Sequence, residues 1–377
     1  MARNINDRLI NLNKRRKGTD RLDRVGIEFA ASIVNDSMIV EKWEKRATAQ
    51  PFTRYALGAM QAVEKRYTDI SIETAVRVGK QLEQGLSMNV DFRLQGSVPL
   101  DVHIRGVSDV DLLTLAGSFL TYTPCGALAC AGWYTSTNRS AVNVLLELRE
   151  EAESVLRAAY PAVTVDCSGG KAIAMSGGSL ARPVDVVPSH WHDNVEYQAG
   201  RREHERGVTI LDKNVPKTIE NSPFLHIHRV NEADIAAVGG IKKAIRLAKN
   251  VKNDAEDEKA ALKLPSFDIA ALLYHADQAA LRAGFQFELA ILAETQRFFD
   301  WCWNNQTAAR QLRTPDGTRV ILNSDDKMDG LRVISVELDT LAGEVAREQS
   351  SVLRHLPTPT RQIINEALRK AYIPAAA

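Results

Sequence analysis

Apolar positions recur with two different periods along the chain. Through residues 24–86 they lie three and four apart, which is typical of amphipathic helices, and Gly85 marks the expected end of the last helix. The runs 92–95 and 110–115 instead alternate and are rich in residues that favour strands. The sequence therefore predicts a helical N-terminal segment followed by two neighbouring strands.

Further strands and then helices are predicted downstream. They are a helix over 140–160, strands over 163–165, 171–175, 183–187 and 208–211, and helices over 232–251, 266–283, 285–303 and from 336 onward. Strands that come before a run of helices are typical of an α+β chain. We expect three parts: an N-terminal helical arm and spine helix over 1–88, a core with a mixed β-sheet over 89–215, and a C-terminal helical domain over 216–377.

Composition places the chain among ordinary globular proteins. Its 377 residues are 45% hydrophobic and 25% charged, which excludes collagen-like, mucin-like and wholly disordered classes. A net charge of +1 argues against a protein that coats a polyanion. Four cysteines are too few for a disulfide framework and no secretory signal is recognised, so we expect a cytoplasmic protein.

Charge is distributed unevenly at two places. Residues 112–138 carry no charge, but glycine, proline and hydroxyl side chains interrupt them, so the sequence predicts no membrane span. Residues 1–25 carry eight basic residues against three acidic ones. Such a segment is either a solvated helical arm or a contact for nucleic acid.

Three aspartates lie in or beside apolar strands. Asp109 and Asp111 are two residues apart, and Asp185 interrupts the apolar run 183–187. Residues two apart on a strand point to one side, so the first two carboxylates are expected to be neighbours. Neighbouring carboxylates repel unless a cation lies between them, and Mg²⁺ prefers such oxygen ligands. The pattern predicts a Mg²⁺ site, with Mn²⁺ as an alternative, in which three acids hold two ions.

A Gly-Ser turn precedes these acids. Gly96 and Ser97 follow a predicted strand, and backbone N–H groups with a hydroxyl at such a turn are suited to phosphate oxygens. The order of the Gly-Ser turn, Asp109/Asp111 and then Asp185 resembles the nucleotidyltransferases of the polymerase-β superfamily. Within them the chain resembles the cGAS/DncV-like nucleotidyltransferases, or CD-NTases, over roughly residues 60–300. The resemblance implies a polymerase-β-like core and assigns catalytic and metal-binding roles to the three aspartates.

The second half of the chain carries the narrower resemblance. Lys242, Arg246 and Lys249 form one cationic stripe on a predicted helix, which is either a solvated face or one edge of a triphosphate site. Ser266 and Phe267 open another helix. The resemblance implies that the triphosphate contacts Gly96, Ser97, Arg246, Lys249 and Ser266. It also implies that Phe267 stacks on a base, although a core position is the alternative for this ring.

Two features depart from the family pattern, and three residue pairs suggest other chemistry. Val102 occupies a position where family members often carry threonine, and Pro99 lies where a short helix would begin. The pairs His190/His192 and His226/His228, each read as lying on a strand, and the pair Cys125/Cys130 could contribute to a zinc site. Their spacing matches no common zinc pattern, so polar surface or hydrogen-bonded core histidines are the expected roles.

The resemblance implies an enzyme that joins ATP, GTP or other NTPs into a cyclic di- or trinucleotide second messenger. We expect a ring of two nucleotides rather than three, because the chain beyond residue 25 shows no basic, aromatic-rich track for a polymer. The family's setting is CBASS anti-phage defence, with a downstream effector and a nucleic-acid or protein activator. Alternatives are a linear oligoadenylate synthase, an RNA-end nucleotidyltransferase and a catalytically silent nucleic-acid sensor. We expect a monomer.

Overall fold

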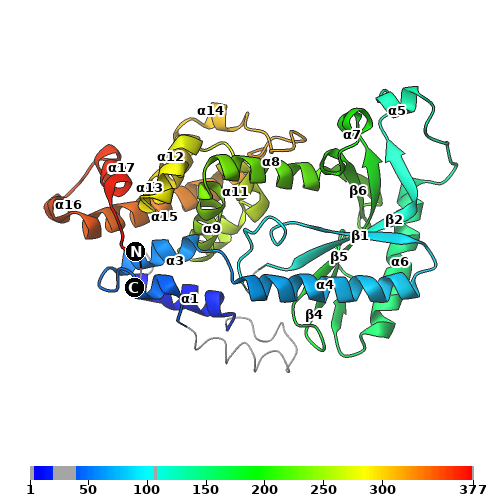
Figure 1. The fold of residues 1–377 in the computed structure, drawn as a ribbon, viewed down its shortest axis with the longest axis horizontal. Coiled ribbons are helices and arrows are strands. Elements are labelled where there is room, and N and C mark those ends of the chain that lie inside the picture. Colours follow the sequence, from blue (N-terminus) through cyan, green and yellow to red (C-terminus); the bar gives the residue numbers. More distant parts are fainter. Residues whose placement is uncertain (1–3, 20–39, 106–107, 376–377) are drawn as a thin grey trace.

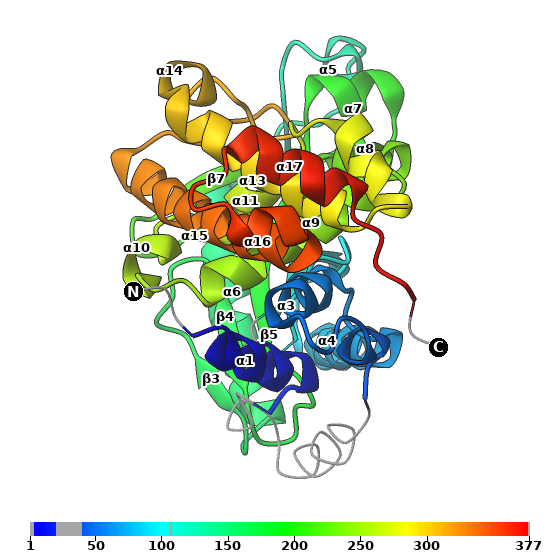
Figure 2. The same ribbon diagram turned by 90° about the vertical axis from the view of Figure 1, so that its left-hand side faces the viewer.

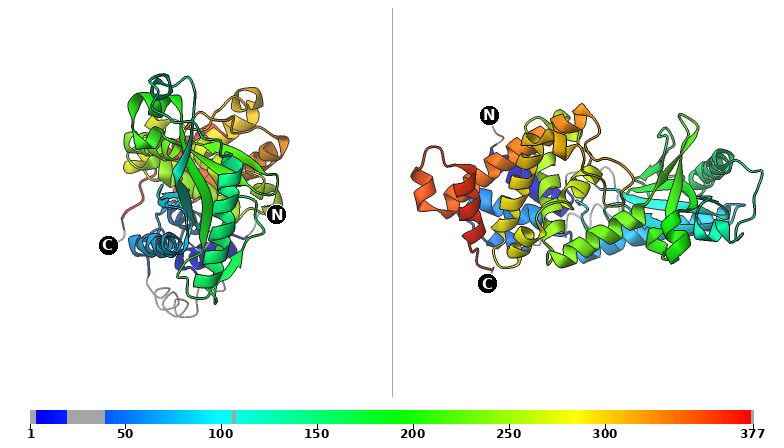
Figure 3. Two further views of the ribbon diagram at one scale, coloured as in Figure 1. Left: turned by 90° about the vertical axis from the view of Figure 1, so that its right-hand side faces the viewer. Right: turned by 90° about the horizontal axis from the view of Figure 1, so that it is seen from above.

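A computed structural model describes residues 4–19, 40–105 and 108–375. A seven-stranded sheet occupies one end of the molecule and a body of helices the other, so the two lie end to end along its long axis (Figures 1 and 3). The strands are β1 (Val90–Gln95), β2 (Val110–Tyr122), β3 (Thr164–Asp166), β4 (Ile173–Ser176), β5 (Val184–Asp193), β6 (Gly207–Asp212) and β7 (Lys217–Asn221).

The sheet is mixed, as predicted. Its main order is β1-β2-β5-β4-β3, and β6 and β7 extend it from the later part of β5. Only β2 and β5 pair in parallel among the described strands, and the other pairs are antiparallel. Helices α4 (Lys65–Gly85) and α6 (Ala141–Ala159) cover one face of the sheet. Alternation along β2 turns Val110 and Leu112 toward these helices, and Asp111 therefore faces the opposite side.

The helical body contains both early and late segments of the chain. It includes α1 (Ile5–Lys17) and α3 (Pro51–Met60), whose apolar residues share one core with the later helices (Figure 2). Those are α8 (Pro223–Ala236), α9 (Gly240–Asn253), α10 (Glu258–Leu262), α11 (Ser266–Leu273), α12 (Gln278–Arg282), α13 (Leu289–Asn304), α14 (Gln306–Ala309), α15 (Asp325–Gln349), α16 (Ser351–His355) and α17 (Arg361–Lys370). Short helices α5 (Ala127–Cys130) and α7 (Val195–Gly200) lie at the far end of the sheet.

The basic N-terminal segment is not a solvated arm where the structure describes it. Arg8 pairs with Glu337 of α15, and Arg15 makes a bidentate pair with Asp254 just after α9. Arg16 and Lys17 also pair with glutamates, while Lys14 is exposed. Arg3, Arg21 and Arg24 lie outside the described residues. Most of the described positive charge on α1 therefore fixes this helix to the helical body. Helix α4 was predicted to belong to the same part of the chain, but it packs on the sheet.

Several predicted helix boundaries are wrong. The single helix expected over 232–251 is two helices, because Val238 and Gly239 adopt φ angles of 52° and 81° that end α8 before α9 begins. The helix expected over 266–283 is also divided, into α11 and α12, and the last long helix begins at Asp325 rather than at 336. Strand β7 was not expected.

No helix among the described residues combines the length and the apolar character that crossing a membrane requires.

Candidate active site

The pairing of β2 with β5 brings two of the predicted acids side by side. Asp111 is the register partner of Asp185 in this parallel pair, so both side chains leave the same face of the sheet. Asp109 lies immediately before β2. The three carboxylates are thus collected from strands that are more than seventy residues apart in the sequence. The sequence predicted this acidic group, and the structure brings it together.

Asp111 is held in an unfavourable environment for a negative charge. Burial, followed by the nearby charges of Asp185 and Asp109, raises the pKa of Asp111 from 3.8 to about 7. Its carboxylate also lies against the turn after β1. A Cβ atom at Gly96 would overlap Asp111 Oδ2, and Gly96 has a φ of +80° that favours glycine. Glycine at this position therefore makes the close approach of the turn to the carboxylate possible.

A cavity of about 720 Å³ opens over these acids, between the sheet and the helical body. This volume is in the range of small-molecule sites. The three aspartates line it together with Gly96 and Ser97 on the sheet side. Lys249, Ser266 and Phe267 line it from the helical side. The structure thus places all but one of the predicted site residues around one cavity.

Arg246 is the exception. It is 6% exposed and is absent from the cavity lining; its Nε donates to Met60 O at 2.8 Å and its Nη1 to Asp101 O at 2.6 Å. The α9 cations were interpreted as one stripe facing solvent or phosphate. This is wrong for Arg246, because its guanidinium is bonded to backbone carbonyls of α3 and of the turn after Gly96 and Ser97. Lys249 does line the cavity, and its Nζ donates to Val102 O at 2.6 Å. Burial and two nearby cations lower the pKa of this amine to about 7.

The base-stacking candidate has neighbours that the sequence did not reveal. The ring of Phe267 is 42% exposed and stacks on His226, with ring centroids 4.4 Å apart. The guanidinium of Arg319 lies 5.2 Å from the same ring and pairs with the buried Asp268. His226, Arg319, Asp316 and Thr318 also line the cavity. His226 lies in α8, and the sequence could have predicted this helix. Its start, Ser222-Pro223, is a typical signal because proline favours the first helical turn.

The chemistry of the acidic group fits Mg²⁺. It offers only carboxylate oxygens, which Mg²⁺ prefers, and the raised pKa of Asp111 reflects a concentration of negative charge that a cation would relieve. In the described part of the chain, no three His, Cys, Asp or Glu side chains converge closely enough to enclose an ion without moving.

The alternative zinc candidates have other surroundings. His190 is buried in β5 with Nδ1 2.9 Å from Trp191 O, and His192 Nδ1 lies 2.9 Å from Thr121 Oγ1. His226 and His228 lie in α8 rather than on a strand, so the prediction that they share one strand face is wrong. The cysteines Cys125 and Cys130 are exposed and unbridged. These histidines have the hydrogen-bonded or stacked surroundings of structural residues.

The departures from the family pattern leave the turn intact. Residues 96–101 form turns rather than a short helix, which is consistent with Pro99 in this segment. Val102 is 2% exposed, and its backbone N–H donates to Ser97 O at 3.0 Å, which closes the turn. An apolar residue at this position therefore anchors the turn through its backbone.

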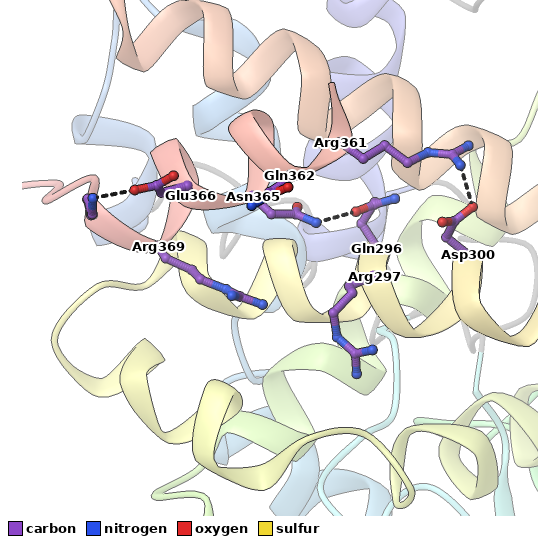
Figure 4. A pocket seen from close by; sticks show the side chains of 9 residues that line it. Gln296, Arg297, Asp300, Arg361, Gln362, Asn365, Glu366 and Arg369 are labelled. Carbon is purple, nitrogen blue, oxygen red and sulfur yellow. Dashed lines mark hydrogen bonds and ion pairs between the residues drawn. The ribbon is translucent and has the colours of Figure 1, made fainter. Parts of the chain in front are cut away.

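A second hollow of about 540 Å³ lies between α13 and α17, in the helical body (Figure 4). Its three arginines are used in ion pairs: Arg361 with Asp300 (Figure 4), and Arg297 and Arg369 with Glu294. None of the predicted site residues lines this hollow. The cavity over the three aspartates is therefore the better candidate for chemistry.

Known proteins similar to this chain point to one family. The model of the cGAS/DncV-like nucleotidyltransferase C-terminal helical domain matches residues 229–335. The cyclic dinucleotide synthase CdnE of Yersinia aleksiciae is 42% identical over 352 residues, which are 90% of this chain and 92% of that protein. A c-di-GMP synthase of a Lachnospiraceae bacterium is 30% identical, over 65% of this chain and 74% of that protein.

A solved structure agrees with these sequence relatives. The STING-associated CdnE c-di-GMP synthase of Capnocytophaga granulosa superimposes with a TM-score of 0.68 at 25% identity, over 90% of this chain and 97% of that one. The match extends over both the sheet and the helical body. Together with the fold and the cavity over the aspartates, these likenesses show that the chain belongs to the cGAS/DncV-like nucleotidyltransferases.

Proposed function

We propose that this chain is a Mg²⁺-dependent nucleotidyltransferase that joins two NTPs into a cyclic dinucleotide. The observation that carries the proposal is the register of Asp111 with Asp185 at the floor of a cavity that Ser97 and Lys249 also line. The relatives named as cyclic dinucleotide synthases support the product class. Three of the relatives are named c-di-GMP synthases, so GTP is the first substrate to test.

The aspartates are proposed to bind metal, and the turn and Lys249 to bind phosphate. Asp109, Asp111 and Asp185 would hold Mg²⁺, which supplies positive charge to the reacting phosphate and hydroxyl oxygens. The turn at Gly96 and Ser97 offers N–H groups and a hydroxyl to a triphosphate. Lys249 faces the same space, and a triphosphate beside its amine would favour the charged form of a group whose pKa burial lowers.

The reaction requires two successive phosphoryl transfers in the same cavity. A ribose hydroxyl of one nucleotide attacks the α-phosphate of the other; a P–O bond forms, pyrophosphate leaves, and the hydroxyl proton passes to solvent. The same exchange within the linear intermediate closes the ring. Ser266 and the partly exposed ring of Phe267 would hold the nucleotide from the helical side, with Phe267 stacking on the base. The phosphate role first assigned to Arg246 is not part of this proposal.

The test is direct synthesis from labelled nucleotides. The purified chain is incubated with each NTP and with pairs of NTPs, in Mg²⁺ or Mn²⁺ and with or without RNA and DNA, and products are treated with phosphatase. A phosphatase-resistant product of two nucleotides is expected. A ladder of phosphatase-sensitive oligomers would instead identify a linear synthase. The absence of any product under every condition would favour a catalytically silent sensor.

Lys249 and Lys243 provide a matched pair of variants. Both lie on α9, but Lys243 pairs with Glu288 outside the cavity lining. Lys249→Ala is expected to lower kcat/KM about tenfold or more, because a charge-assisted contact to phosphate is lost. Lys243→Ala should leave kcat/KM within about twofold, since Lys243 does not line the cavity and Glu288 keeps Arg46 as a partner. Equal effects of the two substitutions would remove Lys249 from the proposed phosphate site.

The product is proposed to act as a second messenger in anti-phage defence of the CBASS type. The structural neighbour from Capnocytophaga granulosa is described as STING-associated, which supports a downstream effector that binds the cyclic dinucleotide. The product of the test above, added to candidate effector proteins encoded beside this gene, would be expected to bind one of them. Failure of every such protein to bind the product would contradict this setting without affecting the proposed chemistry.

A further inference from the structure

Two cationic side chains of helix α9 hold the turn that follows Gly96 and Ser97. They donate hydrogen bonds to the backbone carbonyl groups of two consecutive residues of this turn. Arg246 Nη1 donates to Asp101 O and Lys249 Nζ donates to Val102 O, each at 2.6 Å. The two cations are three residues apart on α9 and so lie on one side of the helix. A carbonyl that accepts a bond from a cation is fixed in direction, and this fixes the peptide plane that follows it.

Arg246 contacts the turn without lining the cavity. Its side chain is buried and does not line the cavity, whereas Lys249 does. The Nε atom of Arg246 donates to Met60 O, the last residue of α3, at 2.8 Å. One guanidinium therefore joins the end of α3, the turn and α9 without lining the cavity over the aspartates.

The residue that Arg246 holds has an uncommon backbone conformation. Asp101 has a φ of 57°, in the left-handed region that a residue with a side chain adopts at an energetic cost. Two backbone hydrogen bonds close the turn around Asp101. Asp101 N donates to Val98 O and Val102 N donates to Ser97 O, both at 3.0 Å. The Asp101 carboxylate is also 3.5 Å from Arg246 Nη1. The Asp101 side chain is about half exposed and does not line the cavity.

We infer that Arg246 is a positioning residue: it holds Asp101 in the left-handed conformation and so fixes the turn over residues 96–102 in the shape that receives the triphosphate. It contacts the turn and not the phosphate. The inference rests on the proposed function for the meaning of the turn, but the shape of the turn can be measured without turnover. It departs from the expectation that both α9 cations bind phosphate directly.

Two substitutions at Asp101 test the importance of the turn's shape. Asp101→Val places a β-branched residue, which strongly disfavours positive φ, at a position outside the cavity. Its kcat/KM is expected to fall about tenfold or more. Asp101→Gly accepts the same φ without strain, so its loss should be several times smaller. Equal activity of the two variants would overturn the inference, because the left-handed conformation would then have no functional consequence.

Arg246→Gln separates positioning from phosphate binding. In the ligand-free protein we expect hydrogen exchange of the Asp101 and Val102 amides to become about tenfold faster, because the turn opens more often. Adding Asp101→Gly to Arg246→Gln is expected to recover part of the lost kcat/KM. Unchanged amide exchange, combined with weaker binding of inorganic triphosphate, would show that Arg246 is a phosphate ligand and would overturn the inference.

The outcomes remain distinguishable from failure of the proposed function. If the wild-type chain makes no cyclic product, the exchange measurement still reports whether Arg246 holds the turn. If Arg246→Gln does not fold, the same amide exchange is measured in Arg246→Lys, which keeps the charge but has a single nitrogen for the carbonyls of Met60 and Asp101.

Discussion

Replacement of Asp111 by asparagine should make the metal-free protein more stable while it abolishes synthesis. The pKa of Asp111 is raised from 3.8 to about 7 by burial and by Asp185 and Asp109. A difference of about three in pKa, at about 1.4 kcal/mol for each unit, corresponds to about 4 kcal/mol at pH 8. This is an upper limit on the free energy that the charged carboxylate costs the folded chain, and Asp111→Asn removes the charge.

The pH dependence of this effect has a definite sign. A carboxyl group whose folded pKa is raised is ionised in both states above pH 7, so its full cost is present there. Between about pH 4 and 7 the folded state keeps the proton and the cost declines as the pH falls. The stabilisation by Asp111→Asn should therefore shrink to less than half at about pH 5. Below the ordinary value of 3.8 it should disappear.

Urea unfolding monitored by tryptophan fluorescence provides the assay. Wild type, Asp111→Asn and the control Asp91→Asn, an exposed aspartate on β1, are compared in EDTA and in excess Mg²⁺ at about pH 8 and 5. Mg²⁺ should stabilise the wild type and the control more than Asp111→Asn, which also makes no cyclic product. If Asp111→Asn is no more stable than wild type in EDTA at about pH 8, or retains the full response to Mg²⁺, the reasoning is refuted.

Other substitutions test separate parts of the structure. Gly96→Ala should lower kcat at least about tenfold, because the new Cβ displaces the Asp111 carboxylate; an alanine variant with normal turnover would contradict this contact. The pKa of Lys249, about 7 in the free protein, should be higher with a triphosphate bound, so the affinity for inorganic triphosphate should fall as the pH rises above 7; a flat profile would argue against it as a ligand. Arg15→Met should destabilise the chain by about 3–5 kcal/mol, since it leaves the buried Asp254 charge without its bidentate partner, and thermal unfolding would measure this loss.

The strands that carry Asp111 and Asp185 were predicted in part, because alternation and apolar runs are local patterns, although β2 and β5 extend beyond the predicted runs. Alternation in the run around Asp111 and the single acid at Asp185 were visible without any knowledge of pairing. That the two residues become register partners depends on the parallel pairing of β2 with β5, which no local pattern specifies. The resemblance to a family supplied this arrangement where the physical pattern alone could not.

Interactions between distant segments account for the parts that sequence reasoning missed. Arg246 was correctly placed on a helix with Lys249, but only the folded chain shows that carbonyls of the turn and of α3 lie opposite its guanidinium. The cations of α1 were counted as free charge, in part because the partners of Arg8 and Arg15 are more than two hundred residues away. Local periodicity reports which side of a helix is apolar and does not report what covers a charged side.

The ion pair of Arg8 with Glu337 joins residues 329 apart in sequence. During synthesis α1 and α3 therefore leave the ribosome long before the helices that complete their core, while the strands and α4 between them can already fold together. The apolar faces of α1 and α3 are therefore first covered when α9 is made, and α15 completes the same core later. A fragment restricted to residues 229–335 would lack part of its own hydrophobic core. Expression of the helical body by itself should therefore require residues 5–60 to be supplied as a second chain or fused through a new linker.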